Sequence, residues 1–362
     1  MAKISRQSTP KVGNRIRLMP GEKVSVGVDT HKKSYHVAVW SLDRDRLLAT
    51  WVQAADPHRL VDRLRPHQEQ VSWVVYEAGP TGYGLVRELR AAELHADVIA
   101  PSLTPSTPGQ QAKSDRLDCR RLAEFAAKGL VRPIEVPTPQ QEADRQILRL
   151  REQMAKKNRQ VKSQIKSFLL LHGVKEPHGL DHWSDASVAD LRTLQLAEPL
   201  RFCLDRLLEE MDHTASLVKK VTACLRAMAA TKRHASGIAL LQTTPGVGPL
   251  TAMTYRLELP RPERFDNSRE VALMMGLAPH VRSSGMTRRE GRLMRAGNPR
   301  LKAVLVEAAW RWIRKDPAAG VRYRRLVANT GNANKAIVAM ARKLGIILWR
   351  MSLTGECYRE AA

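Results

Sequence analysis

The sequence contains few aromatic residues and no long apolar run, and each of these absences argues against a class of function. Aromatic residues make up 5% of the chain, which argues against nucleic-acid binding on a broad stacking platform. No apolar run approaches the roughly 18 residues of a membrane span, and the N-terminus lacks the apolar core of a signal peptide. We therefore expect a cytoplasmic protein without a membrane partner.

Cysteine is also scarce, and acids are too few to balance the bases. The four cysteines are scattered and form no CxxC or Cys/His cluster, which argues against structural zinc and fits a reducing compartment. Lys and Arg number 60 against 36 Asp and Glu, which gives a net charge of +24. Such an excess predicts a polyanionic partner, and nucleic acid ranks ahead of an acidic membrane surface, which we do not expect as a partner.

Residues 23–137 are predicted to form an α/β sheet domain, which follows a flexible basic arm at residues 1–22. Three strands come first, and strands then alternate with helices, as in mixed α/β sheets. The predicted strands cover residues 23–29, 35–40, 47–54, 71–76 and 96–100, and the predicted helices cover 57–66, 83–92 and 114–129.

Four carboxylates of this domain are candidate metal ligands. Asp115 and Asp118 are spaced i, i+3 and share one face of a helix, while Asp29 and Glu77 each end an apolar strand. If all four converge at one sheet edge, they can bind one or two Mg²⁺ or Mn²⁺ ions for phosphodiester chemistry. The alternative is a solvated helix start and exposed strand ends.

Cations and a histidine stand next to these acids. Lys113 and Arg116 flank Asp115, where they either hold nucleic acid or offset the negative charge. His31 follows Asp29 closely and either assists in the site or is a solvent-facing loop residue.

Residues 138–232 are predicted to form a coiled-coil hairpin of two long helices joined by residues 172–186. Such a hairpin can dimerise the protein. The stretch 145–166 holds eight Lys or Arg and one acid, which favours nucleic-acid contact over a solvated face.

Residues 233–362 are predicted to be mainly helical, with two further candidate sites. Gly246 and Gly248 lie between helical patterns as in a helix-hairpin-helix, where the backbone approaches a phosphate; a structural turn is the alternative. The basic loop 280–289 contains Ser284, which is either a nucleophile or part of a plain turn. Arginines that can neutralise a phosphoryl transition state are Arg282, Arg288 and Arg289.

Taken in order, these motifs resemble the DEDD transposases of the insertion-sequence family one-ten, relatives of the Piv DNA invertases. The resemblance covers most of residues 23–350. Its markers are Val28–Lys32, Glu77–Gly82, Lys113–Asp118, Pro245–Gly248, Phe265, Gly276–Pro279, Ser284-Gly285 and Gly297-Asn298. The chain departs from the family pattern in its basic N-terminal extension and at residues 292–297, and neither segment includes a proposed site residue.

The resemblance implies a RuvC-like, RNase H-type first domain whose acids Asp29, Glu77, Asp115 and Asp118 bind Mg²⁺. It also implies a C-terminal domain whose serine, Ser284 with Ser283 as its neighbour, attacks DNA to form a covalent phosphoserine. Further implications are double-stranded donor and target DNA, a homodimer or tetramer in which the acids of one protomer complete the serine site of another, and, for some members, a noncoding bridge RNA.

The implied function is that of a transposase or site-specific recombinase in the nucleoid of a prokaryote. Two other hypotheses stay open. A junction-resolving nuclease or a DNA invertase would use the same acids, the nuclease with water in place of serine. An architectural DNA- or RNA-binding protein would use the basic surface without catalysis.

Overall fold

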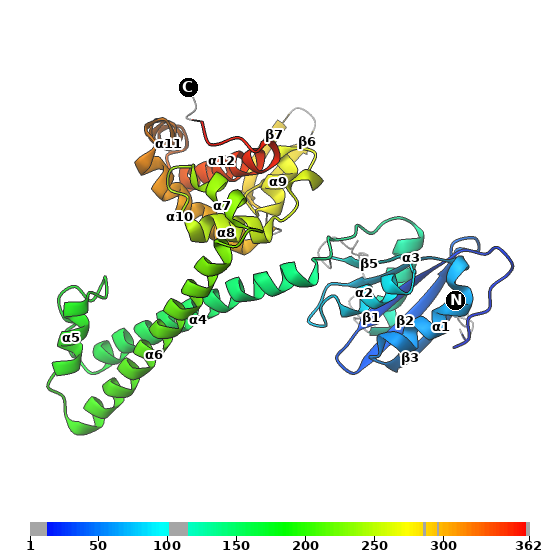
Figure 1. Ribbon diagram of the computed structural model, residues 1–362, viewed down its shortest axis with the longest axis horizontal. Helices are drawn as coiled ribbons and strands as arrows, with labels where there is room; N and C mark the ends of the chain where they lie inside the picture. The colour runs from blue at the N-terminus through cyan, green and yellow to red at the C-terminus, as the bar shows by residue number, and fades with distance from the viewer. Residues whose placement is uncertain (1–12, 101–114, 285–286, 295–296, 360–362) are drawn as a thin grey trace, which may run out of the picture. The chain divides into compact units, whose positions relative to one another are not determined.

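The computed structural model describes residues 13–100, 115–284, 287–294 and 297–359, apart from the side chains of 115–117 and 280–292. The chain divides into two units, Met1–Pro137 and Thr138–Ala362, which are coloured blue to cyan and green to red in Figure 1. The predicted boundaries at residues 22 and 232, inside these units, stay predictions.

The first unit is built on a five-stranded sheet in the order β3-β2-β1-β4-β5. β1 pairs antiparallel with β2 and parallel with β4, β2 pairs antiparallel with β3, and β4 pairs parallel with β5. Three antiparallel strands followed by two parallel ones are the RNase H-type, RuvC-like arrangement that we expected. Each predicted strand is confirmed with its ends shifted by at most one residue: β1 (Val24–Thr30), β2 (Ser34–Ser41), β3 (Arg46–Ala54), β4 (Val71–Glu77) and β5 (Ala96–Ile99).

Helices cover both faces of this sheet. α1 (Pro57–Leu64) and α2 (Gly84–Ala91) pack on the face that presents Val28 and Tyr76. α3 (Asp115–Ala127) packs on the opposite face, against Val75. The mostly β-branched strands are buried on both sides, as expected where parallel strands carry crossover helices.

The expectation of a flexible arm is wrong for residues 13–22. Ile16 and Leu18 pack against the core beneath α1 and α2, and the carbonyl of Gly13 accepts a hydrogen bond from the backbone of Thr50. Glu22 is buried and accepts hydrogen bonds from Arg44 and Ser41. The basic composition concealed these apolar contacts; residues 1–12 lie outside the described part of the chain.

The second unit begins with the predicted helical hairpin. α4 (Pro139–Leu171) and α6 (Glu198–Ala229) run antiparallel, with Ile165 and Leu208 in the core between them. The second helix starts five residues earlier than the predicted 203, and a short helix, α5 (Asp185–Thr193), lies in the connection. None of the described helices has the length and apolar character needed to cross a membrane.

The rest of the second unit is a helical bundle around α12 (Ala333–Thr354), whose apolar face is buried. The prediction of a loop at residues 280–289 is wrong, because β6 (Pro279–Ser284) and β7 (Thr287–Leu293) pair there as an antiparallel hairpin. Its polar sequence lacks the apolar alternation that marks a half-buried strand. The other helices are α7 (Ala235–Gln242), α8 (Pro249–Glu258), α9 (Ser268–Met274), α10 (Pro299–Lys315) and α11 (Pro317–Thr330).

Candidate active site

Glu77 is the last residue of β4 and Asp29 the second-to-last residue of β1, and both lie at the same edge of the sheet. Val28 lies opposite Tyr76 in the β1–β4 pairing, so Asp29 and Glu77 occupy the next position along each strand. Because successive residues of a strand face opposite sides, and Val28 and Tyr76 face α1 and α2, both carboxylates face the side that α3 covers.

A close backbone contact fixes where α3 lies over β1. A Cβ atom on Gly27 would lie 2.2 Å from the carbonyl oxygen of Cys119 and 2.4 Å from the backbone nitrogen of Ala123. The buried hydroxyl of Ser25 donates to the carbonyl of Ala123 at 2.6 Å. Glycine in a β-branched strand is a recognised sign of such a close approach, although the sequence alone does not name the partner.

This contact brings the start of α3 to the end of β1. Asp29 is two residues beyond Gly27, or about 6.6 Å along the strand, which equals about four residues of helix. Moving four residues back along α3 from the contact at 119–123 reaches the first turn, which contains Asp115 and Asp118. In agreement, burial and the nearby Asp29 carboxylate together raise the pKa of the Cys119 thiol to about 11.

The backbone geometry thus places Asp29, Glu77 and the first turn of α3 at one edge of the sheet. Asp29, Glu77 and Asp118 are half-buried. Asp115 opens α3, but its side chain and that of Arg116 lie outside the description, as does all of Lys113. Among the described side chains, no group of three His, Cys, Asp or Glu is placed to hold a metal ion. The donors themselves, all carboxylate oxygens, suit a hard divalent cation.

His31 contacts this edge. Its Nε2 lies 3.1 Å from Oδ2 of Asp29, and its ring packs edge-to-face on His36, 5.6 Å away between centroids. His36 is also the cross-strand neighbour of Asp29 in β2. The imidazole of His31 thus contacts the Asp29 carboxylate and can orient it. The spacing of two residues in the sequence does not decide whether this contact forms.

Ser284 belongs to the second unit, as the last residue of β6. Its Cα pairs with Thr287, Ser283 pairs with Arg288, and Arg282 pairs with Arg289. The pairing brings the three predicted arginines to the same end of the hairpin as the two serines. The side chains of all five lie outside the description.

The two glycines of the predicted helix-hairpin-helix lie between α7 and α8 but differ in their surroundings. Gly246 has φ +86°, and a Cβ there would lie 2.6 Å from the backbone nitrogen of Trp312 in α10. The close approach at Gly246 is therefore to another helix of the protein, which matches the structural alternative. Gly248, the N-cap of α8, has open space around its Cα and stays a candidate for phosphate contact.

The sheet order and a match to the DEDD transposase profile place the first unit in the RNase H-type, DEDD class of enzymes. The chain belongs to the transposase family described as IS116/IS110/IS902: that family's profile matches residues 238–324, and the DEDD transposase profile matches residues 26–173. Members with this DEDD domain are DNA-cleaving and DNA-recombining enzymes.

Relatives that match most of this chain are themselves named as transposases. The chain is 30% identical to y4rJ of Sinorhizobium fredii, named as a transposase, over 76% of each chain. It is 25% identical to the transposase for insertion sequence element IS1111A of Coxiella burnetii, over 69% of each chain. A solved structure of T. thermophilus RuvC with a Holliday junction matches 31% of this chain and 99% of that one, at 13% identity and a TM-score of 0.24.

Proposed function

We propose that this transposase excises and inserts the DNA of its insertion sequence through a covalent phosphoserine intermediate on Ser284. The observation that supports it most is the shared edge of Asp29, Glu77 and the first turn of α3. Four carboxylates at one edge repel one another unless a cation lies between them, so the arrangement suits Mg²⁺ or Mn²⁺ held by Asp29, Glu77, Asp115 and Asp118.

The chemistry divides between the two units. When bound, a divalent cation withdraws charge from the scissile phosphate. The Ser284 hydroxyl attacks phosphorus, a Ser–O–P bond forms as the P–O bond to the leaving nucleotide breaks, and the serine proton ends on the leaving oxygen. Arg282, Arg288 and Arg289 supply positive charge at that end of the hairpin. The reverse attack by a deoxyribose hydroxyl on the phosphoserine rejoins the strand.

The experiment compares Ser284→Ala with the matched variant Ser283→Ala on a supercoiled plasmid that carries the ends of the element. We expect Ser284→Ala to abolish both recombination and the protein–DNA adduct seen on a denaturing gel, whereas Ser283→Ala retains them. An adduct that persists in Ser284→Ala would refute the assignment of the nucleophile.

A hydrolytic nuclease is the competing function, because the carboxylate edge alone is sufficient for attack by water. Asp118→Asn removes one acid and should abolish cleavage under either mechanism. Cut DNA ends with no protein adduct in the wild-type protein would favour the nuclease. If Asp118→Asn behaves like the wild-type protein in every assay, a non-catalytic architectural role would be favoured instead.

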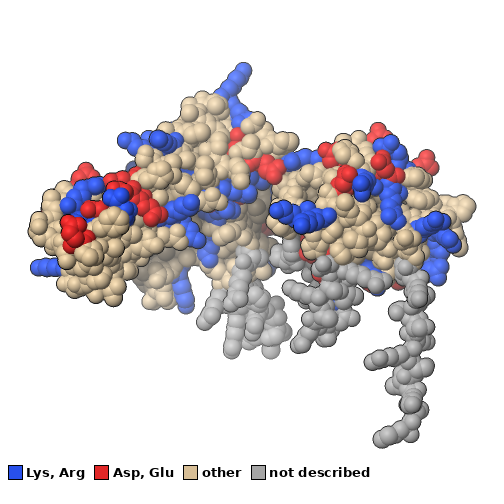
Figure 2. All heavy atoms as spheres, turned by 90° about the horizontal axis from the view of Figure 1, so that it is seen from below, with Lys and Arg blue, Asp and Glu red and all other residues tan. Residues whose placement is uncertain are grey.

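We also propose that double-stranded donor and target DNA and a noncoding bridge RNA bind a homodimer or tetramer. The support is the net charge of +24 and the Lys and Arg side chains spread over the face drawn in Figure 2. Sequencing the RNA that copurifies with the protein, followed by recombination with and without RNase treatment, tests the guide. Recombination that survives complete RNA removal would exclude it, and light scattering gives the oligomeric state.

A further inference from the structure

The α11–α12 hairpin carries positive charge without any acid to balance it. Between Pro317 and Gly355 the sequence has seven Lys or Arg and no Asp or Glu. Five of the seven line one groove of about 1100 Å³, here called the α11–α12 groove, and none forms an ion pair with a residue that the structure describes. These five cations are Arg322, Lys335, Arg342, Lys343 and Arg350.

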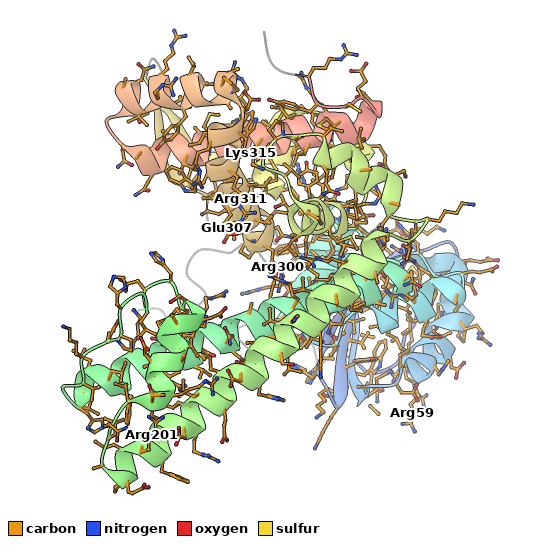
Figure 3. The ribbon with its side chains drawn as sticks, turned by 60° about the vertical axis from the view of Figure 1, so that its left-hand side comes forward. Arg59, Arg201, Arg300, Glu307, Arg311 and Lys315 are labelled. Atoms are coloured by element: carbon orange, nitrogen blue, oxygen red, sulfur yellow. The ribbon has the colours of Figure 1, made fainter. Side chains whose placement is uncertain are left out.

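The charges of α10 are arranged differently. Arg300, Glu307, Arg311 and Lys315 follow one side of that helix in Figure 3, so an acid interrupts the row. Nε of Arg300 also donates to Oε2 of Glu152 on α4 at 2.7 Å. The positive charge of the α11–α12 groove is not compensated in this way within the described chain, so it is available to an external anion.

Two features of the groove favour a phosphodiester backbone as that anion. The first turn of α12 opens into it through Asn332, Asn334 and Lys335, and backbone N–H groups at a helix N-terminus attract phosphate. Burial, and after it the charge of Arg322, lowers the pKa of Lys343, as expected for a cation beside another cation. An anion between them would reverse this repulsion.

The floor of the groove is apolar, formed by Leu326, Val338, Ile346 and Ile347. Cations above an apolar floor match the alternation of phosphates and sugar–base edges along a nucleic-acid strand. Pro279 and Leu293, the first residue of β6 and the last of β7, also line the groove. The groove therefore lies at the base of the hairpin whose far end carries Ser284.

We infer that the α11–α12 groove binds the DNA strand beside the phosphate that Ser284 attacks. Pro279 and Ser284 are five residues apart on β6, about 17 Å along a strand, which corresponds to about five nucleotides of B-DNA. The groove would then hold phosphates about five nucleotides from the cleavage point. The position relative to cleavage rests on the function proposed above, whereas the binding of DNA by the groove does not.

The test compares two double variants with the same change in net charge. Arg342→Gln/Lys343→Gln removes two groove cations, whereas Arg324→Gln/Arg325→Gln removes two cations of α11 that lie outside the groove. Both are made in a Ser284→Ala background, so that no covalent adduct disturbs equilibrium binding. The probe is a fluorescent 30-base-pair DNA duplex, titrated by anisotropy at several salt concentrations, and circular dichroism checks that each variant is folded.

Each phosphate contact contributes about 0.9 to the slope of log K against log salt. We expect the groove variant to bind the duplex more weakly and to lose about 1.8 from that slope, whereas the control keeps it. Between about 50 and 200 mM salt, the affinity of the control should therefore fall about 12-fold more than that of the groove variant. Equal slopes and affinities for the two variants would overturn the inference, whatever else occupies the groove.

A second arm distinguishes DNA from RNA, because both carry phosphodiesters. The titrations are repeated with an RNA duplex of the same length and sequence. A loss of slope for RNA alone would assign the groove to RNA and refute our inference. Loss for DNA with unchanged adduct formation in Ser284→Ala, measured separately, would support the groove while refuting the proposed nucleophile.

Discussion

Gly27→Ala should disrupt the carboxylate edge without changing any carboxylate. The new Cβ would lie 2.2 Å from the carbonyl oxygen of Cys119, whereas ordinary contact begins at 3.4 Å, so α3 must move by about 1.2 Å. The two nearest atoms, the carbonyl oxygen of Cys119 and the backbone nitrogen of Ala123, belong to the main chain, so the helix has to shift as a whole. Because α3 carries Asp115 and Asp118, both acids move away from Asp29.

Two effects of different size follow from this shift. Overpacking of this kind costs about 1–3 kcal/mol in the free energy of unfolding, which thermal melts should detect as a lower midpoint for the first unit. A misplacement of about 1 Å in a catalytic site can reduce the rate about 100-fold. We therefore expect DNA cleavage by Gly27→Ala to fall by about two orders of magnitude under conditions where the protein is still folded.

Gly84→Ala is the matched control, because Gly84 opens α2 and a methyl group added to it would meet no atom within 4 Å. Alanine there should leave activity unchanged and stability equal or slightly higher. Wild-type stability and cleavage in Gly27→Ala would show that close packing of α3 on β1 does not set the site. Lower stability with full cleavage would show that the position of α3 is not what aligns the acids.

Three further predictions use melting and binding measurements. Gly246→Ala should lower the midpoint of the second unit because α10 blocks the methyl group, whereas Gly248→Ala should not; equal midpoints would refute the packing role. Hydrogen bonds from Arg44 hold the pKa of Glu22 at about 2, so this carboxylate stabilises the first unit above about pH 4.5 and less as pH falls towards 2; Glu22→Gln should flatten that decline. Mg²⁺ at about 100 times its Kd should add about 2.7 kcal/mol to the stability of the wild-type protein, and Asp29→Asn should remove the gain; a gain that persists would place the ion elsewhere.

The strands and most helices could be predicted because their signals are local. Alternating β-branched residues predict the five strands to within one residue. Strand ends and an i, i+3 spacing also single out Asp29, Glu77, Asp115 and Asp118 as candidate ligands. Composition likewise predicted the nucleic-acid partner, because net charge sums over residues wherever they lie. The hairpin at β6 and β7 escaped prediction because its strands are polar and lack that alternation.

Only the tertiary structure decided which distant residues meet. Gly27 contacts Cys119 across 92 positions of the chain, and this contact places the start of α3 beside Asp29. The pattern around Gly246 is typical of a phosphate contact, but the backbone of α10 occupies the space beside this glycine. Ile16 and Leu18 pack against the core although the composition around them is typical of disorder. Such contacts depend on how two separate elements fit together, so the sequence around either residue does not contain them.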